Sequence, residues 1–348
     1  MRTLLIVAGL MLLVPAVASA AGSSCIPHAS CWRPYAATSP FNRPIPADAP
    51  TAEGSARIVR KLSSWGQPQN LIAGGSWGRP LYFAKRTDPQ FTVRCAQRWG
   101  TCEIEGHKIR IPDRALAARP RYPAGDAHMG VVQPDGWEYD FWQVRRKPRG
   151  GGTVLISWGG RTRIDGDGLD SNATAGLYGT AAGVVRAAEL HAGKINHALT
   201  ITVRCDAGRS VFPAVNHSGL ACDQIGSSPR HAPPMGARLQ LRMSASQIER
   251  LPNPRWHKTL LHAMANYGMI VGDTGGSSWA LILQAGETFT SFGQPDPLIA
   301  FAKRNGWEPF FDVDNEGGRH VHVGKLAGAV NWQKHLRVVS PCVSRGDC

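Results

Sequence analysis

Two stretches of the sequence, WEYDFWQV at 137–144 and GTVLISW at 152–158, show the pattern that decides the expected fold. Both are short apolar or alternating runs with aromatic or β-branched residues, which is typical of β-strands. Similar runs recur between turn residues: LYFAK (81–85), FTVRC (91–95), KIRIP (108–112), GVVQP (130–134), HALTITVRC (197–205) and ARLQLRM (237–243). This recurrence indicates an all-β protein, and we expect a jelly-roll-like β-sandwich.

One or two helices are expected at the periphery of this sandwich. The segment PRWHKTLLHAMANYGM, at 254–269, places Leu260 and Met264 on one face of a helix, with proline at its start and glycine near its end. A shorter helix is expected at 296–304, and residues 55–62 can also form a short helix. The long helix should pack on the outside or at an end of the sandwich, because only one of its faces is apolar.

The composition is that of a globular protein with an N-terminal export signal. The chain has 348 residues, of which 43% are hydrophobic and 18% charged, and this excludes a disordered chain. Residues 4–20 are apolar, follow Arg2 and end in small residues, so residues 1–20 are predicted to be a secretory signal peptide. The proline-rich segment 21–54 should run extended, and 55–348 should form a single β-sandwich domain.

The charge balance indicates the kind of partner. Without Arg2 of the leader, 38 Lys and Arg residues stand against 25 Asp and Glu residues, a net charge of +13. Such a charge favours an anionic polymer, while the dispersed basic residues argue against nucleic acid. No second apolar run is long enough to span a membrane, so we expect a secreted monomer that binds no membrane after leader removal.

Eight cysteines follow the leader, an even number that indicates disulfides in an oxidising compartment. The simplest pairing joins neighbours along the chain: 25–31, 95–102, 205–222 and 342–348. An alternative joins the N-terminal pair to the C-terminal pair. The sequence contains no CxxC motif, which argues against a zinc site built from thiolates.

The first candidate site lies on the predicted strand at 137–143. Alternation places Glu138, Asp140 and Trp142 on one face, with two carboxylates about 6–7 Å apart beside an indole. One carboxylate can act as acid and the other as base or nucleophile of a glycosidase, while the indole stacks on a sugar ring. The spacing is similar to the start of the ExDxxE signature of laminarinase-type jelly-roll glycosidases. Gln143 occupies the last position of that signature and removes its acid.

A second hypothesis is a polysaccharide lyase, which needs a base, an acid and a cation that neutralises a uronate carboxylate. His197 could act as the base and Tyr139 as the acid. Arg161 or Arg163 could supply the cation. On this hypothesis the opposite face of strand 137–143 would line the cleft.

Further candidates are histidines and an aromatic side chain near the same strands. His128 precedes a predicted strand and is a second candidate base, whereas His217 is a candidate substrate-binding residue. Trp137 could stack on a sugar beside Trp142. If the protein is an enzyme, the catalytic groups should converge on one concave sheet face.

Metal binding is considered at two places. Asp165, Asp167 and Asp170 alternate with glycines as in the first half of a calcium-binding loop, although no glutamate completes the pattern, so Ca²⁺ is the one cofactor considered. His320 and His322 lie two residues apart on a predicted strand, and a nearby carboxylate could complete a zinc site.

Three longer motifs point to a family. The stretches TAGLYGTAAGVVRAAELHAGKINHALTITV (174–203), PPMGARLQLRMS (233–244) and LLHAMANYGMIVGDTGG (260–276) resemble a group of exported bacterial proteins, common in actinobacteria, of unsettled activity. The resemblance implies a secreted β protein that acts on polysaccharides, and it assigns no catalytic residue.

Three functions follow from these observations. We expect a secreted glycoside hydrolase acting on an extracellular polysaccharide. The alternatives are a polysaccharide lyase and a non-catalytic carbohydrate- or cell-wall-binding protein. A protease or esterase ranks last, because the sequence contains no HExxH and every cysteine has a place in a predicted disulfide.

Overall fold

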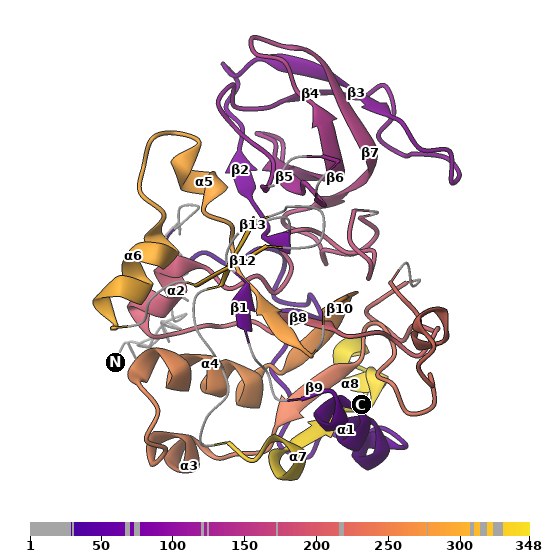
Figure 1. Cartoon of the computed structure of the whole chain (residues 1–348), viewed down its shortest axis with the longest axis vertical. Helices are drawn as coiled ribbons and strands as arrows, with labels where there is room; N and C mark the ends of the chain where they lie inside the picture. Colours follow the sequence, from indigo (N-terminus) through magenta and orange to yellow (C-terminus); the bar gives the residue numbers. More distant parts are fainter. Residues whose placement is uncertain are drawn as a thin grey trace, which may run out of the picture.

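Figure 1 shows the computed structural model of the chain. It describes residue 29 and residues 31–66, 70–72, 77–119, 122–123, 125–171, 173–215, 219–276, 278–306, 310–313, 319–322 and 330–348. For 70–72, 310–313 and 319–322 the backbone alone is described. The predicted leader at 1–20 lies outside these residues.

The strands form two sheets, and the described chain is mostly β, compatible with a β-sandwich. The six-stranded sheet has the order β2-β5-β6-β7-β3-β4 and the eight-stranded sheet the order β12-β13-β1-β11-β8-β10-β9-β14. The first contains β2 (Leu81–Phe83), β3 (Gln90–Cys95), β4 (Lys108–Arg110), β5 (Met129–Val132), β6 (Trp137–Arg146) and β7 (Gly152–Arg163). The second contains β1 (Asn70–Ile72), β8 (Leu199–Val203), β9 (Arg238–Leu241), β10 (Met269–Thr274), β11 (Ala280–Ile282), β12 (Phe310–Val313), β13 (Arg319–His322) and β14 (Leu336–Val338).

The jelly-roll topology is not confirmed, because a jelly roll is antiparallel and both sheets here are mixed. The pairs β2·β5, β3·β7, β1·β11 and β8·β10 are parallel. Parallel pairs need longer connections than hairpins, which leaves room for more helix than expected. The described helices are α1 (Ser55–Ser64), α2 (Ala187–Ala192), α3 (Ala245–Glu249), α4 (Arg255–Asn266), α5 (Glu287–Thr290), α6 (Pro297–Arg304), α7 (Trp332–His335) and α8 (Pro341–Arg345). Figure 1 shows α1, α3, α4, α7 and α8 around the eight-stranded sheet, with the six-stranded sheet at the opposite end of the molecule.

The expected helices are present where the sequence places their signals. Helix α4 begins after Pro254 and buries Leu260 and Met264, so the amphipathic face is confirmed. Helix α6 begins after Asp296, whose carboxylate accepts the N–H groups of residues 298 and 299 as an N-cap. The sequence predicts a helix that continues to residue 269, but α4 ends at Asn266 and β10 begins at Met269. The helix ends there because Gly268 adopts a left-handed conformation (φ 76°).

Three hydrophobic clusters connect the elements. One lies within the six-stranded sheet and includes Phe91 and Phe141, and a larger one packs the helices on the eight-stranded sheet. A third joins Leu81 and Val132 of the six-stranded sheet to Ile270 of β10. The two sheets therefore share a common core at their junction. That 55–348 forms one domain stays a prediction.

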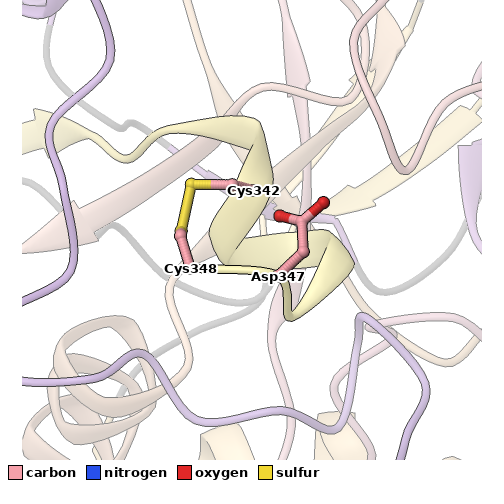
Figure 2. A group of neighbouring side chains, drawn as sticks. All are labelled: Cys342, Asp347 and Cys348. Carbon is pink, nitrogen blue, oxygen red and sulfur yellow. A yellow bond between two sulfur atoms is a disulfide. The ribbon is translucent and has the colours of Figure 1, made fainter.

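Three of the four predicted disulfides are confirmed: Cys95–Cys102, Cys205–Cys222 and Cys342–Cys348. Figure 2 shows the last of these at the end of α8. Cys31 is disulfide-bonded as well, and Cys25 lies outside the described residues. Within the described part of the chain, no helix has the length and apolar character needed to cross a membrane.

Candidate functional site

A cavity of about 510 Å³ lies at the junction of the two sheets and is lined by residues from both. The six-stranded sheet contributes Trp142 of β6 and Trp158 of β7, and β10 contributes Asp273. The loop between β7 and α2 forms a further wall through residues 173–175 and 177. A cavity that combines apolar walls with a few convergent polar groups is the usual form of a ligand site.

Three indoles gather on one side of this cavity. Trp142 and Trp158 are directly opposite each other on paired strands, and Trp99 covers them with ring centroids 5.5 and 5.7 Å away. Trp99 is 63% exposed, which is unusual for so large an apolar side chain. An exposed indole beside two half-buried ones offers a flat surface on which a sugar ring can stack.

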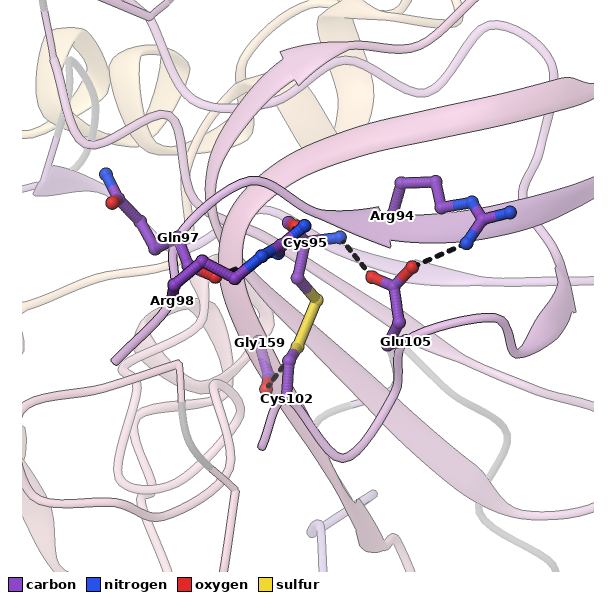
Figure 3. Close-up of a disulfide and its surroundings, with 7 residues drawn as sticks. All are labelled: Arg94, Cys95, Gln97, Arg98, Cys102, Glu105 and Gly159. Carbon is purple, nitrogen blue, oxygen red and sulfur yellow. Dashed lines mark hydrogen bonds and ion pairs between the residues drawn. A yellow bond between two sulfur atoms is a disulfide. The ribbon is translucent and has the colours of Figure 1, made fainter. Parts of the chain in front are cut away.

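A disulfide holds the loop that carries Trp99. Cys95 ends β3, and its bond to Cys102 closes the loop between them, as Figure 3 shows. Glu105 accepts the backbone N–H of Cys95 at 2.6 Å and a guanidinium hydrogen bond from Arg94 at 2.7 Å, which anchors the base of the loop further. The loop is therefore fixed at its base while Trp99 at its tip meets the solvent.

A line of four polar side chains connects the two sheets at the cavity wall. Arg79, just before β2, donates to Asp273 Oδ2 at 2.7 Å and to His128 Nδ1 at 3.2 Å. His128 Nε2 lies 3.7 Å from Asp126 Oδ2, and Asp126 Oδ1 accepts the indole N–H of Trp142 at 3.2 Å. Because a guanidinium only donates, Nδ1 of His128 is the acceptor, and a neutral ring then carries its hydrogen on Nε2, toward Asp126.

The two carboxylates of this line have opposite pKa shifts. Burial raises the pKa of Asp126, but the hydrogen bonds from His128 and from the indole N–H of Trp142 outweigh it, and the net shift is downward. Burial raises the pKa of Asp273, and the Arg79 charge only partly offsets this. Burial and the Arg79 charge lower the pKa of His128, which favours the neutral ring. The two carboxylate side chains are 35% and 27% exposed, so both can meet a ligand.

Strained backbone occurs beside Asp126 and Trp142. Ala127 has φ 41° and Gln143 has φ 53°, left-handed values that residues with a Cβ seldom adopt. Two hydrogen bonds join these two backbone segments. The Gln143 N–H donates to the Asp126 carbonyl at 2.8 Å, and the Val144 N–H donates to the Ala127 carbonyl at 3.1 Å. Such strain is often concentrated at functional sites, and here it lies directly beside two residues that line the cavity.

The predicted pair Glu138 and Asp140 shares a face of β6 with Trp142 but is fully buried. Glu138 accepts the Tyr35 hydroxyl at 2.7 Å and the Ala181 N–H at 2.8 Å. Asp140 accepts the Ser171 hydroxyl at 2.6 Å and an N–H of residue 180 at 3.1 Å. The loop between β7 and α2 thus covers these carboxylates and leaves the face open only at Trp142. Neither carboxylate can therefore reach a polysaccharide, and the expected convergence with His128 or His197 is absent.

His197 lies in a buried ion cluster at the start of α2, away from the cavity. Its Nε2 is 2.9 Å from Glu189, which also binds Arg186 at 2.8 Å, and its Nδ1 lies 2.8 Å from the carbonyl of the next residue. The side chain is 3% exposed. The structure gives it contacts that hold α2, and it does not bring it to Tyr139.

The face of β6 and β7 opposite Glu138, Asp140 and Trp142 carries four further predicted residues: Tyr139, Trp137, Arg161 and Arg163. The Tyr139 hydroxyl is 3.1 Å from His107 Nδ1, and most of the side chain is buried in the core. Arg161 and Arg163 stack on Trp137 at 4.1 and 5.4 Å, which forms a second, open hollow. Both guanidinium groups are already bound to carboxylates, since Arg161 donates to Glu103 and Arg163 to Asp165.

The proposed calcium loop lies in that second hollow. Asp165 is engaged by Arg163 through two hydrogen bonds of 2.9 and 2.8 Å, and Asp167 accepts the N–H of residue 169 at 3.1 Å. Across the described residues, the one group with three possible ligand atoms within 4.8 Å of one another is Cys342, Asp347 and Cys348, so Asp165, Asp167 and Asp170 do not form one. Figure 2 shows that the two sulfurs of that group are bonded to each other, so they are not thiolate ligands.

Some predicted residues lie where the structure gives no side chain. His217 is outside the described residues, and for His320 and His322 only the backbone is described. Of the residues in this cavity, His128 and Trp142 were predicted from the sequence, whereas Asp126, Asp273 and Trp99 were not. Asp126 stands two residues before His128, a DxH spacing that could have drawn attention to it.

Comparison of the chain with family models, with curated proteins and with solved structures gives no match. The resemblance to exported actinobacterial proteins therefore stays a prediction.

Proposed function

We propose that the protein is a secreted glycoside hydrolase whose active site is the cavity at the junction of the two sheets. The observation that carries the proposal is that this cavity gathers three indoles and two solvent-accessible carboxylates. Indoles bind sugar rings by stacking, and paired carboxylates are the catalytic groups of most glycosidases. The disulfides and the predicted leader support export.

The roles of the two carboxylates follow from their surroundings. Asp126, with its lowered pKa, is the ionised group that takes a proton from the attacking water. Asp273, with its raised pKa, is the acid that protonates the glycosidic oxygen as the bond to the sugar breaks. His128 touches Asp126 from the buried side and acts as a positioning residue. Asp126 and Asp273 thus replace Glu138 and Asp140 in the proposed mechanism.

The test is an assay of the purified protein on a panel of neutral and anionic polysaccharides. A hydrolase releases reducing ends without forming an unsaturated product, whereas a lyase forms both, and the ultraviolet absorbance of the product separates them. Binding without either product would indicate the non-catalytic alternative and overturn the proposed activity.

The position of the site is tested with two tryptophan variants. Trp99→Ala should weaken binding of oligosaccharides about tenfold, because it removes an exposed stacking surface. Trp137→Ala removes an indole from the second hollow and should leave binding unchanged. If Trp137→Ala weakens binding and Trp99→Ala does not, the site lies in the second hollow.

A further inference from the structure

A second cavity, of about 480 Å³, lies where β6 ends, and its lining combines five basic side chains with apolar ones. Its lining includes Arg114, Arg145, Arg146, Lys147 and Arg149. Asp113 is the one carboxylate among the lining residues that the structure describes. We call this cavity, with these five basic residues, the basic pocket.

Two of the five cations are held in fixed positions at the inner side of the basic pocket. Arg145 Nε donates to Ser157 Oγ at 2.8 Å, and its guanidinium stacks on the Tyr122 ring at 4.5 Å. Lys147 Nζ donates to the Asp113 carbonyl at 2.9 Å and lies 5.1 Å from the Phe91 ring. Burial and the charge of Arg149 lower the pKa of Lys147, as expected for a cation among other cations.

The remaining three, Arg114, Arg146 and Arg149, are exposed at the rim. The Asp113 carboxylate accepts the Gly150 N–H at 2.6 Å and lies 4.0 Å from Arg149, so it is already engaged. Five basic side chains around one occupied carboxylate leave an excess of positive charge in a concave site. Guanidinium groups in such a site bind sulfate or carboxylate groups through paired hydrogen bonds.

The basic pocket continues the proposed active site along β6. Trp142 lines the first cavity and Arg146 the basic pocket, and four residues of strand span about 13 Å. Ser157 Oγ, the acceptor for Arg145, also donates to Gln143 Oε1 at 2.6 Å, so hydrogen bonds connect the basic pocket to the residue next to Trp142. A short oligosaccharide can span this distance.

We propose that the basic pocket binds the sulfate or carboxylate groups of an anionic polysaccharide whose sugar rings occupy the neighbouring cavity. The inference rests on the proposed function and specifies its substrate class. The compact, concave shape favours single anionic groups on a sugar chain over the extended backbone of a nucleic acid, which is bound by basic stripes.

The test compares two triple variants of the full chain with the same loss of charge. The first is Arg114→Gln/Arg146→Gln/Arg149→Gln in the basic pocket. The control is Arg57→Gln/Arg60→Gln/Arg250→Gln, three exposed arginines on or beside α1 and α3. Neither variant touches the proposed catalytic residues. Affinities are measured by titration with dextran sulfate, polygalacturonate, neutral dextran and a DNA duplex at low and high salt.

The basic-pocket variant should lose about tenfold in affinity for an anionic polysaccharide at low salt, the effect of three exposed charge contacts, while the control stays within about twofold. The loss should be confined to dextran sulfate if sulfate is the ligand, or to polygalacturonate if it is carboxylate. Equal losses in both variants, or tighter binding of the DNA duplex than of either polymer, would overturn the inference. If the wild type binds anionic polymers through the pocket but cleaves none, the proposed function fails and the pocket stands.

Discussion

The protein contains two pairs of carboxylates near β6, and they differ in what covers them. Glu138 and Asp140 are fully buried beneath the loop between β7 and α2, whereas Asp126 and Asp273 are partly exposed in a cavity. The first pair is close in sequence, and the second is assembled from segments almost 150 residues apart. Alternation along a strand thus identifies which side chains share a face, while the segment that packs on this face decides which of them meet solvent.

The largest effect should come from Asp126→Asn. The amide keeps the shape of the side chain but cannot accept a proton, so cleavage should fall by on the order of 1,000-fold. Thermal unfolding should show a stability close to that of the wild type, because the side chain is partly exposed. Full activity in this variant would show that Asp126 and Asp273 are not the catalytic pair.

Glu138→Ala should act on stability. It leaves the Tyr35 hydroxyl and the Ala181 N–H without their buried acceptor, and the free energy of unfolding should drop by about 3 kcal/mol in urea denaturation. Glu138→Gln is the matched control and should cost less, since its side-chain oxygen can still accept one hydrogen bond. A Glu138→Ala protein that is as stable as the wild type but inactive would reverse the roles of the two pairs.

The loop that carries Trp99 allows a test of the surroundings of Asp126 and Asp273. Removing the Cys95–Cys102 disulfide with Cys95→Ser/Cys102→Ser should lower the free energy of unfolding by about 2.5 kcal/mol and weaken oligosaccharide binding, because the loop loses its closure. Cys342→Ser/Cys348→Ser opens a loop of similar length far from the cavity. This control should lose similar stability and bind sugar normally, and a binding defect in both variants would argue against a specific role of the loop.

The smallest effect concerns pH. Burial and the neighbouring Asp140 raise the pKa of Glu138 well above its ordinary value of 4.5. The folded protein then retains a proton that the unfolded chain releases, so this group's contribution to stability is present below pH 4.5 and is lost as pH rises toward the folded pKa. Relative to Glu138→Gln, the wild type should lose up to about 1.4 kcal/mol per pH unit in this window. Parallel stability curves for the two proteins would show that Glu138 is ionised in the fold.

The sequence predicted local features well because they depend on neighbouring residues. Period-two alternation located β6 and β7, and the spacing of Leu260 and Met264 located α4. The mixed sheets were not predictable in this way, since parallel pairs such as β8 and β10 join segments far apart in the chain. The site shows the same division. His128 and Trp142 carried a local signal, whereas Asp273 reaches the cavity because β10 packs near Arg79, which no local pattern shows.

The chain of contacts from Asp126 through His128 and Arg79 to Asp273 crosses between two halves of the molecule, each built on one of the two sheets. The proposed chemistry therefore requires that these halves pack together. Arg79 is almost completely buried where the six-stranded and eight-stranded sheets meet, and its two partners come from opposite sides of that boundary. Neither half alone contains both carboxylates, so a fragment could fold its own sheet and still lack an active centre. Recovery of turnover during refolding would therefore time the moment at which the halves come together, independently of when each sheet forms.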